Sequence, residues 1–409
     1  MAESNYLVEA PAVVSLFAGA GGTDIGLERA GWRTVIGADS DTSCIRTLQH
    51  AQRARIAVRG QPGRFHLDGA IPMLADIREM SAADFRPPGM PIDWRPDLLA
   101  GGPPCQPWSS SGLQKGWDDA RGLLIQQFIR LTSELRPQFV LFENVRGLLT
   151  AVGHSGRPGE ILQLIKRSFE DLGYATTFAT INAADYGAPQ RRVRLFMMAT
   201  LDYILPEFPA PTHQPLTAMT GSAVKSWVSL SDCLTTLPSP EPGDVARPTP
   251  ARNAELSRLS PGTGLRTKGR VENNRPGGHW GYRQDGFLAD PNLPARTVRA
   301  ATTPDWLRLP DGTHRRLTWK ECAALQGFPA EWPFHGSSTE RFRQIGNAIQ
   351  TDVAEMLGHA IMASYRSGPQ DAKPISQPLP AEFARRIRYT TAEHRTNGSH
   401  RVRVRASVT

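Results

Sequence analysis

The sequence predicts an α/β protein with a doubly wound, mostly parallel β-sheet and a second, smaller and loop-rich domain. Short apolar runs alternate with helical patterns along the first part of the chain, beginning at Val13–Ala18. Several of these runs stop at glycine, proline or acidic residues, as strands do at the ligand-binding edge of such sheets. After about residue 203, Pro-, Gly- and Ser-rich sequence replaces the periodic patterns.

Composition indicates an ordinary globular protein with a polyanionic partner. The chain has 409 residues, enough for two or three domains, and its net charge is +8 with a pI of about 9.6. The four cysteines are widely separated, which argues against a disulfide framework and against a zinc site: Cys44, Cys105, Cys233 and Cys322. The N-terminal residues lack a signal-peptide pattern, and no apolar run is long enough to span a membrane. We therefore expect a cytoplasmic protein without a bound metal.

The first strand, Val13–Ala18, leads into a glycine-rich turn. Gly19, Gly21 and Gly22 follow the strand, and a helical pattern then runs to Ala30. Strand, glycine turn and helix in this order are typical of the nucleotide-binding start of a doubly wound sheet, where glycine lets the backbone approach a ligand. The spacing is not GxGxxG, so a nicotinamide dinucleotide is not favoured.

A second strand, Thr34–Ala38, ends at a carboxylate. Asp39 at this position can accept hydrogen bonds from ribose hydroxyls. The alternative is a helix N-cap, because Asp39, Ser40 and Asp41 precede a helical pattern. Both interpretations stay open, and they can apply to different residues. The third strand is expected to end near Asp76–Ile77.

A fourth strand, Asp97–Ala100, is followed by the rigid stretch GGPPCQPWSSSG at Gly101–Gly112. Prolines hold Cys105 in a stiff turn, which suits a nucleophile that meets its target at a fixed angle. The alternative is a small buried cysteine in a tight turn. The segment Ser109–Arg121 is either a loop that closes over a substrate or an ordinary surface connection.

A helix over Gly122–Arg136 precedes the fifth strand, Phe139–Phe142, which ends at Glu143. Neighbouring parallel strands release their loops at the same edge, so Glu143 is expected near Cys105. A thiol and a carboxyl at one edge can serve as nucleophile and proton donor. The alternative for Glu143 is a capping or salt-bridged side chain.

A helix over Glu160–Leu172 precedes two further strands, Tyr174–Ile181 and Val193–Ala199. Arg192 and Arg194 alternate with apolar residues and project from one face of the second of these strands. Paired arginines suit recognition of phosphate, carboxylate or base edges. A solvated edge strand would carry charges in the same way.

The region 204–296 holds little periodic pattern. Its last fifty residues, 247–296, carry nine Lys or Arg against four Asp or Glu. Aromatic and basic residues interleave there, as on surfaces that read nucleic acid, although a linker can have a similar composition: Arg275, His279, Trp280, Tyr282, Arg283 and Phe287.

Order returns at Ala295–Ala300. A short helix is expected over Leu317–Phe328, and Gln344–Asn347 is expected to introduce the last helix, Ala348–Tyr365. The remaining residues, Ser367–Thr409, carry eight Lys or Arg against three Asp or Glu. They are expected to form a flexible basic tail, either with affinity for phosphates or with no role.

Several short motifs resemble those of the C5-cytosine DNA methyltransferases of bacterial restriction–modification type. They occur in the family's order across Val13–Tyr365: LFAGAGG (Leu16–Gly22), GGPPCQPWS (Gly101–Ser109), FENV (Phe142–Val145), QRRVR (Gln190–Arg194), RTV (Arg296–Val298), LQGFP (Leu325–Pro329) and QIGNA (Gln344–Ala348). The resemblance implies a Rossmann-like S-adenosylmethionine-dependent methyltransferase fold. It implies a catalytic domain at 1–203 completed by 330–366, and a target-recognition domain at 204–329, with the tail at 367–409.

The resemblance also assigns roles to single residues. It implies that S-adenosylmethionine contacts Phe17, Gly19, Gly21, Gly22, Asp39, Asp76, Ile77, Leu124 and Asn347. It implies that Cys105 is the nucleophile, that Glu143 contacts cytosine N3, and that Arg192 and Arg194 orient the base and the catalytic groups. The chain departs from the family's pattern at Ser15, Ser40 and Gln350, none of which is a catalytic group.

The implied activity is transfer of a methyl group to C5 of a cytosine flipped out of double-stranded DNA, through a covalent bond between Cys105 and cytosine C6. The implied enzyme is a monomer whose partners are duplex DNA and a cognate restriction endonuclease. Two other functions remain open: a tRNA cytosine-5 methyltransferase, whose Cys-Phe-Thr signature is absent here, and a non-catalytic DNA-binding relative.

Overall fold

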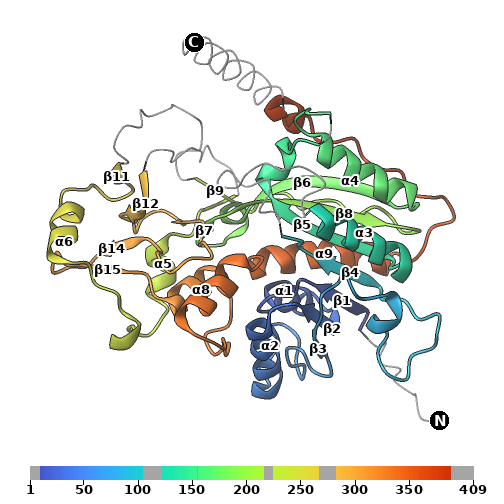
Figure 1. The fold of residues 1–409 in the computed structure, drawn as a ribbon, viewed down its shortest axis with the longest axis horizontal. Coiled ribbons are helices and arrows are strands. Elements are labelled where there is room, and N and C mark those ends of the chain that lie inside the picture. Colours follow the sequence, from blue (N-terminus) through green and yellow to red (C-terminus); the bar gives the residue numbers. More distant parts are fainter. Residues whose placement is uncertain (1–9, 105–121, 154, 216–223, 267–281, 388–409) are drawn as a thin grey trace, which may run out of the picture.

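A computed structural model describes residues 10–104, 122–153, 155–215, 224–266 and 282–387 (Figure 1). Cys105 and the segment 109–121 lie outside the described residues, so the predictions made for them are not tested. The same holds for Arg275, His279 and Trp280 in the predicted recognition region.

A seven-stranded sheet forms the centre of the larger part of the molecule, with the strand order β3-β2-β1-β4-β5-β8-β6 (Figure 1). Its strands are β1 (Ala12–Leu16), β2 (Arg33–Asp39), β3 (Ile71–Leu74), β4 (Leu98–Gly101), β5 (Phe139–Val145), β6 (Ala175–Asn182) and β8 (Val193–Thr200). The first five in this order run parallel, and β8 is antiparallel to both of its neighbours. The predicted doubly wound, mostly parallel sheet is therefore confirmed.

Alternating strand residues face two different layers of helices. In β4, Leu98 and Ala100 join a buried cluster with α1 (Gly22–Arg29) and α9 (Thr351–Arg366). Leu99 joins a cluster with α3 (Gly122–Leu135) and α4 (Glu160–Asp171). Because neighbouring strand residues point to opposite faces, both sides of the sheet are covered. None of the described helices is both long and apolar enough to cross a lipid bilayer.

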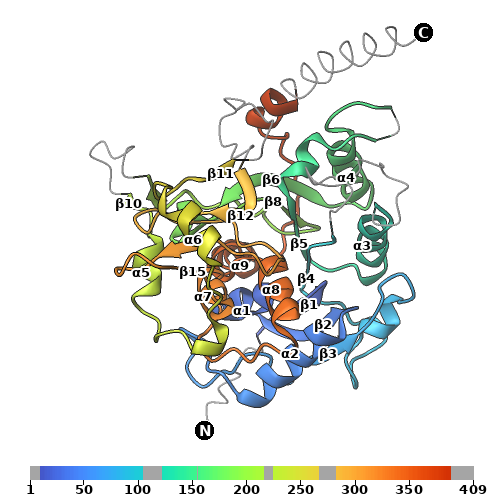
Figure 2. The same cartoon turned by 60° about the vertical axis from the view of Figure 1, so that its left-hand side comes forward.

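The smaller part consists of short strand pairs and short helices (Figure 2). The pairs are β7 (Gln190–Arg191) with β13 (Ala295–Arg296), β9 (His213–Gln214) with β10 (Lys225–Ser226), β11 (Gly264–Arg266) with β12 (Tyr282–Phe287), and β14 (Trp306–Arg308) with β15 (His314–Arg316). The helices are α5 (Leu230–Leu234), α6 (Pro250–Ser257) and α7 (Trp319–Leu325), and α8 (Ser338–Asn347) follows them along the chain, before α9. Such short strands contain too few residues for an alternation of polar and apolar positions to be recognised.

The predicted last helix is confirmed as α9, which begins at Thr351 rather than at Ala348. The residues expected to introduce it, Gln344–Asn347, instead form the last turn of α8. Helix α8 starts with a capping box in which the Ser337 hydroxyl accepts from the Glu340 amide and the Glu340 carboxylate accepts from the Ser337 amide. Its sequence is mostly polar, so a hydrophobic period did not reveal it. Helix α2 (Thr42–Ala54), by contrast, packs against β2 and β3 as its pattern predicts.

The predicted flexible tail does not begin at Ser367. The Gln370 amide donates a hydrogen bond to the Asp202 carbonyl at 2.6 Å, and the Gln377 amide donates to the Thr176 carbonyl at 2.9 Å. Phe383 is only 1% exposed and belongs to the same buried cluster as α3 and α4. Residues 369–387, which we call the C-terminal strap, therefore pack against the sheet, because this basic segment also carries apolar residues.

A carboxyl group in α1 is buried without full hydrogen bonding. Asp24 accepts a hydrogen bond from the Thr34 hydroxyl through Oδ1 at 3.2 Å, while its Oδ2 has no hydrogen-bond partner among the described residues. Burial, and then the nearby charge of Glu28, raise the pKa of Asp24 to about 7.

We expect Asp24 to make the protein less stable as the pH rises from about 4 to about 7. In this range the unfolded chain has lost the Asp24 proton and the folded protein still holds it, so the free energy of unfolding falls by roughly 1.4 kcal/mol per pH unit. Above pH 7 this effect is constant. Asp24→Asn should remove the decline, so the variant should exceed the parent in urea-denaturation stability at pH 8 but not at pH 4. Asp93→Asn, at an exposed position, is the control; equal slopes in all three proteins would contradict the expectation.

Candidate active site

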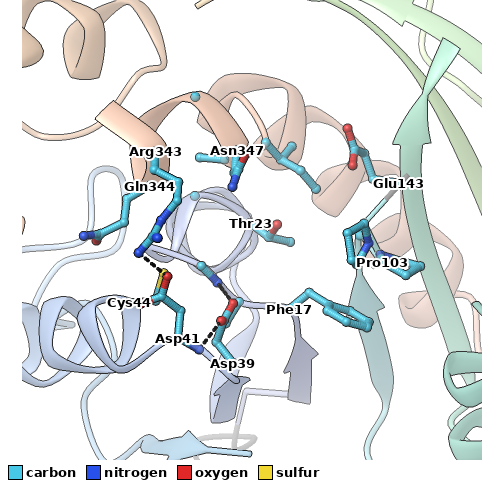
Figure 3. Close-up of a pocket in the computed structure, with 18 of the residues that line it drawn as sticks. Phe17, Thr23, Asp39, Asp41, Cys44, Pro103, Glu143, Arg343, Gln344 and Asn347 are labelled. Carbon is cyan, nitrogen blue, oxygen red and sulfur yellow. Dashed lines mark hydrogen bonds and ion pairs between the residues drawn. The ribbon is translucent and has the colours of Figure 1, made fainter. Parts of the chain in front are cut away.

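The carboxyl ends of four parallel strands meet at one edge of the sheet. Leu16 at the end of β1 pairs with Ala38 of β2 and with Gly101 of β4, and Gly101 pairs with Phe142 of β5. A cavity of about 430 Å³ opens at this edge (Figure 3). This volume is within the range of small-molecule binding sites. Open α/β sheets bind their ligands at this same place, outside the carboxyl ends of the strands.

The glycine turn after β1 is fixed to the end of β2. The Gly19 amide donates a hydrogen bond to Asp39 Oδ2 at 2.8 Å, and the backbone of Gly19 has a positive φ of 56°. A side chain at Gly22 would lie 2.6 Å from the Ile349 carbonyl, so only glycine lets α1 start this close to the segment before α9. The turn thus forms one wall of the cavity.

The two interpretations of the acidic residues after β2 apply to different residues. Asp41 caps α2, because its carboxylate accepts a hydrogen bond from the Ser43 amide at 2.9 Å. Asp39 instead accepts from the amides of Gly19 and Asp41, and it lines the cavity. Burial is the largest influence on Asp39 and raises its pKa. Asp39 therefore does not cap α2, and its predicted contact with a ligand remains open.

Glu143 lies at the opposite side of the cavity from Asp39 (Figure 3). Its Oε1 is 3.1 Å from Arg194 Nε, and a side chain at Gly102 would lie 2.9 Å from its Oε2. Burial raises the pKa of Glu143, and the charges of Arg194 and Arg192 oppose that rise. Glu143 therefore contacts Arg194 within the cavity wall.

Asn144 ties β5 to the segment that leads to Cys105. Its side-chain amide donates a hydrogen bond to the Pro103 carbonyl at 3.1 Å, and the contact is buried. Pro103 and Pro104 also line the cavity. The chain therefore enters the undescribed segment at Cys105 from the wall that contains Glu143. Asn144 was not singled out from the sequence, although it stands beside Glu143 in the FENV motif.

The two arginines of the QRRVR motif have different partners. Arg192 is 3% exposed, and its guanidinium donates hydrogen bonds to the carbonyls of Val298, Gly346 and Ala348 at 2.9 to 3.1 Å. Arg194 pairs with Glu143. The interpretation as a solvated edge strand is wrong, because β8 lies between β5 and β6. Both arginines line the cavity, and Arg192 also joins distant parts of the chain.

Two glutamines complete this junction. Gln190 Nε2 donates a hydrogen bond to the Leu325 carbonyl at 3.1 Å, and Gln190 Oε1 accepts from the Val298 amide at 2.7 Å. Gln326 Nε2 donates to the carbonyls of Ile345 and Ala348. Both glutamine side chains are fully buried. Four motifs that are far apart in the sequence therefore meet behind the cavity.

Most of the predicted site residues that the structure describes line this one cavity. These are Phe17, Gly19, Gly22, Asp39, Glu143, Arg192, Arg194 and Asn347. Four others do not line it: Gly21, Asp76, Ile77 and Leu124. Asp76 forms an ion pair with Arg78. Ile77 belongs to the hydrophobic core, and Leu124 packs against it. Gly21 caps the start of α1 with a positive φ. Their proposed cofactor contacts remain predictions.

The structure adds residues to the cavity wall that the sequence did not indicate. Thr23, Asp41, Cys44, Arg343, Gln344 and Ile349 all line it. Arg343 extends from α8 and pairs with Asp41 (Figure 3). No sequence signal identified Arg343, because α8 itself was not predicted.

The described cysteines are poor candidates for a nucleophile. Cys44, Cys233 and Cys322 are free thiols, and burial raises the pKa of each, to about 11 for Cys233. These thiols stay protonated near neutral pH, whereas the thiolate is the reactive form.

Comparison with known proteins adds independent evidence. The model of the family described as C-5 cytosine-specific DNA methylase matches residues 12–363. The type II methyltransferase M.FnuDI of Fusobacterium nucleatum is 27% identical over 383 residues, which cover 89% of this chain and 98% of that protein. M.Eco47II of Escherichia coli is 30% identical over 381 residues, which cover 86% of this chain and 78% of that protein.

Solved structures share the fold. A DNA modification methyltransferase encoded in an E. coli prophage aligns with a TM-score of 0.58 at 24% identity, over 87% of this chain and 100% of that one. The Entamoeba histolytica methyltransferase EhMeth aligns with a TM-score of 0.58 at 13% identity, over 87% of this chain and 99% of that one. The fold of the chain therefore agrees with the family match.

Proposed function

Because the chain belongs to the C-5 cytosine-specific DNA methylase family, we propose that it transfers a methyl group from S-adenosylmethionine to C5 of a cytosine flipped out of a specific duplex DNA site. The class of activity, DNA cytosine-5 methylation, follows from the family and from its type II methyltransferase relatives. The single observation that carries the proposed chemistry is the Glu143–Arg194 pair in the cavity wall, beside the segment that leads to Cys105.

The end of the cavity formed by β1 and β2 suits S-adenosylmethionine. Asp39 presents a carboxylate for ribose hydroxyls, and Phe17 presents an aromatic ring to the same cavity (Figure 3). A Cβ atom added at Gly19 would lie 4.0 Å from its nearest neighbour, the Phe17 carbonyl oxygen. The turn therefore leaves room for a ligand. Asn347, at the end of α8, also lines the cavity. When bound, the cofactor supplies an electrophilic methyl group on a sulfonium.

The residues at the other end of the cavity would activate the base. The Cys105 thiolate would add to cytosine C6 and form a carbon–sulfur bond, which makes C5 nucleophilic. Glu143, whose pKa is raised by burial, would share a proton with N3 and stabilise the ring as its charge develops. Arg194 would hold the Glu143 carboxyl in place. After C5 gains its methyl group, loss of the C5 proton and departure of the thiolate restore the aromatic ring.

The depth of the cavity requires that the base leave the helix. Glu143 is 9% exposed, so a cytosine stacked in duplex DNA could not reach it. The region 204–329 would read the sequence around the extruded base. There Arg296 lies 3.6 Å from the ring centre of Phe287 and forms an ion pair with Asp305. Arg316 lies 4.0 Å from the ring centre of Trp306 and donates to the Asp285 carbonyl, so both basic groups are fixed by their neighbours.

The biological setting is proposed from the relatives. Two type II methyltransferases, M.FnuDI and M.Eco47II, align with most of this chain. We therefore infer a cytoplasmic modification enzyme of restriction–modification type. It would act as a monomer beside a cognate endonuclease. The catalytic domain would comprise 1–203 and 330–366.

We expect the purified protein to transfer labelled methyl groups from S-adenosylmethionine to duplex DNA and not to tRNA. Bisulfite sequencing of DNA from an expressing host should show protected cytosines in one common sequence context. The same host carrying an empty vector is the control. Label in tRNA alone would instead identify an RNA methyltransferase, and cofactor binding without transfer to either substrate would identify a non-catalytic relative.

A further inference from the structure

An ion pair joins α8 to the start of α2 at the rim of the cavity (Figure 3). Arg343 lies in α8, and Asp41 stands directly before α2, 302 residues earlier in the chain. Both residues line the cavity, and their side chains are 45% and 29% exposed, so the pair stands where the cavity meets solvent. The Arg343 guanidinium also donates a hydrogen bond to the Ser43 hydroxyl at 3.3 Å. Two distant segments of the chain are therefore tied together at this rim.

Both oxygens of the Asp41 carboxylate have partners. Oδ1 accepts hydrogen bonds from the Ser43 amide at 2.9 Å and from the Ser43 hydroxyl at 2.7 Å. Oδ2 accepts from the Arg343 guanidinium. The carboxylate is therefore held in one orientation by groups of the protein, and its role is to hold its neighbours rather than to bind a ligand.

The backbone of Asp41 holds the carboxylate of Asp39. The Asp41 amide donates a hydrogen bond to Asp39 Oδ1 at 2.9 Å, and the Gly19 amide donates to Asp39 Oδ2 at 2.8 Å. Burial is the largest influence that raises the pKa of Asp39, and the negative charge of Asp41 also raises it. The positive charge of Arg343 beside Asp41 offsets this repulsion between the two carboxylates. Arg343 thus acts on Asp39 through Asp41, both by geometry and by charge.

The residue next to Arg343 fixes α8 against α2. The Thr47 hydroxyl donates a hydrogen bond to Gln344 Oε1 at 2.7 Å, and this contact is buried. Gln344 Nε2 donates to the His335 carbonyl at 2.8 Å, and the His335 amide donates to the Thr47 hydroxyl at 2.9 Å. Because these bonds set the register of α8 on α2, the Arg343 side chain extends toward Asp41 from a fixed point.

We propose that Arg343 is a positioning residue for the cofactor: it holds Asp41, whose amide in turn orients the Asp39 carboxylate toward the ribose hydroxyls of S-adenosylmethionine. This inference rests on the proposed function, in which Asp39 is the ribose contact. It assigns to Arg343 an effect on cofactor affinity that passes through Asp41, and not through a contact between Arg343 and the ligand.

The test is a double-mutant cycle that is read by cofactor binding. Isothermal titration calorimetry without DNA gives the Kd for S-adenosylmethionine of Arg343→Gln, of Asp41→Asn and of the double variant. Asparagine caps a helix as well as aspartate does, so Asp41→Asn removes the charge and keeps the cap of α2. We expect each single variant to bind about five- to tenfold more weakly, and the double variant to bind no more weakly than either. Arg343→Lys keeps a positive charge and should bind within about twofold of the parent.

Arg46→Gln is the matched control. Arg46 lies in α2, and its Nη1 is 3.4 Å from His335 Nε2, but it does not line the cavity. This variant should keep the affinity of the parent, and an equal loss in it would overturn the proposal.

Two other results would overturn the proposal: parent affinity in Arg343→Gln, or additive losses in the double variant, since additivity means that Arg343 and Asp41 act independently. If Arg343→Gln does not fold, parent affinity in Asp41→Asn decides in the same way. A parent protein that binds no S-adenosylmethionine would instead refute the proposed function.

Discussion

Cys105→Ser is expected to abolish methyl transfer to DNA, with a loss of about 10⁴-fold or more in rate. A serine hydroxyl is far less acidic than a thiol, so it does not supply the anion that adds to cytosine C6. The three cysteines that the structure describes do not substitute, because burial raises the pKa of the thiols of Cys44, Cys233 and Cys322 and keeps them protonated. Transfer of a labelled methyl group to duplex DNA measures the effect.

Two controls separate lost chemistry from lost folding. Cys233→Ser lies outside the cavity and should keep full activity. Cys105→Ser itself should still bind S-adenosylmethionine and DNA. A cytosine with fluorine at C5 cannot lose a proton there, so DNA containing it should stay covalently bound to the parent protein and not to Cys105→Ser. Methyl transfer that survives the substitution would refute the covalent mechanism.

Glu143→Gln is expected to lower kcat by about 10² to 10⁴-fold. Glutamine has nearly the same shape and can donate a hydrogen bond to N3, but it cannot share a proton with the ring. The raised pKa of Glu143 also gives the parent a characteristic pH profile. The active carboxyl is the protonated form, so the rate should fall as the pH rises through the pKa of Glu143. Ionisation of the thiol should limit the rate at low pH.

In Glu143→Gln the rate should no longer fall at high pH, but it should still fall at low pH. Methyl-transfer rates measured from pH 5 to pH 9 would show this. Glu134→Gln, on the exposed surface of α3, is the control and should retain both. Because Arg194 loses its partner in Glu143→Gln, cofactor binding must be shown to persist. An unchanged kcat, or an alkaline fall that remains in the variant, would exclude Glu143 as the proton donor.

The sheet and one half of the cavity could be predicted from the sequence, because most of their strands are buried apolar runs that stop at glycine, proline or acidic residues. The rule for parallel strands predicted Glu143 at the edge of the sheet where β4 ends, and Asp39 and Glu143, which stand at or near strand ends, do line one cavity there. The resemblance added Asn347, which no local pattern would bring to the same cavity.

Other features depend on contacts that no local pattern contains. Helix α8 is polar and was missed, and Arg343 was missed with it. Arg192 and Arg194 are two residues apart, and nothing in the sequence assigned them different partners. In the structure Arg192 donates hydrogen bonds to three backbone carbonyls, whereas Arg194 pairs with Glu143. The strap was mistaken for a tail, because a single buried phenylalanine, Phe383, among charged and Pro-rich sequence gives little signal of docking.

The wall contributed by Gly346, Asn347 and Ile349 has a consequence for synthesis of the protein. The other walls come from the first half of the chain, so a nascent polypeptide displays the glycine turn and the acidic strand ends long before their last partner leaves the ribosome. Arg192 meanwhile has no carbonyls from residues 346 and 348 to bind. A new copy of this enzyme therefore gains its ability to mark DNA only after residues 346–349 have been translated and have folded onto the earlier walls.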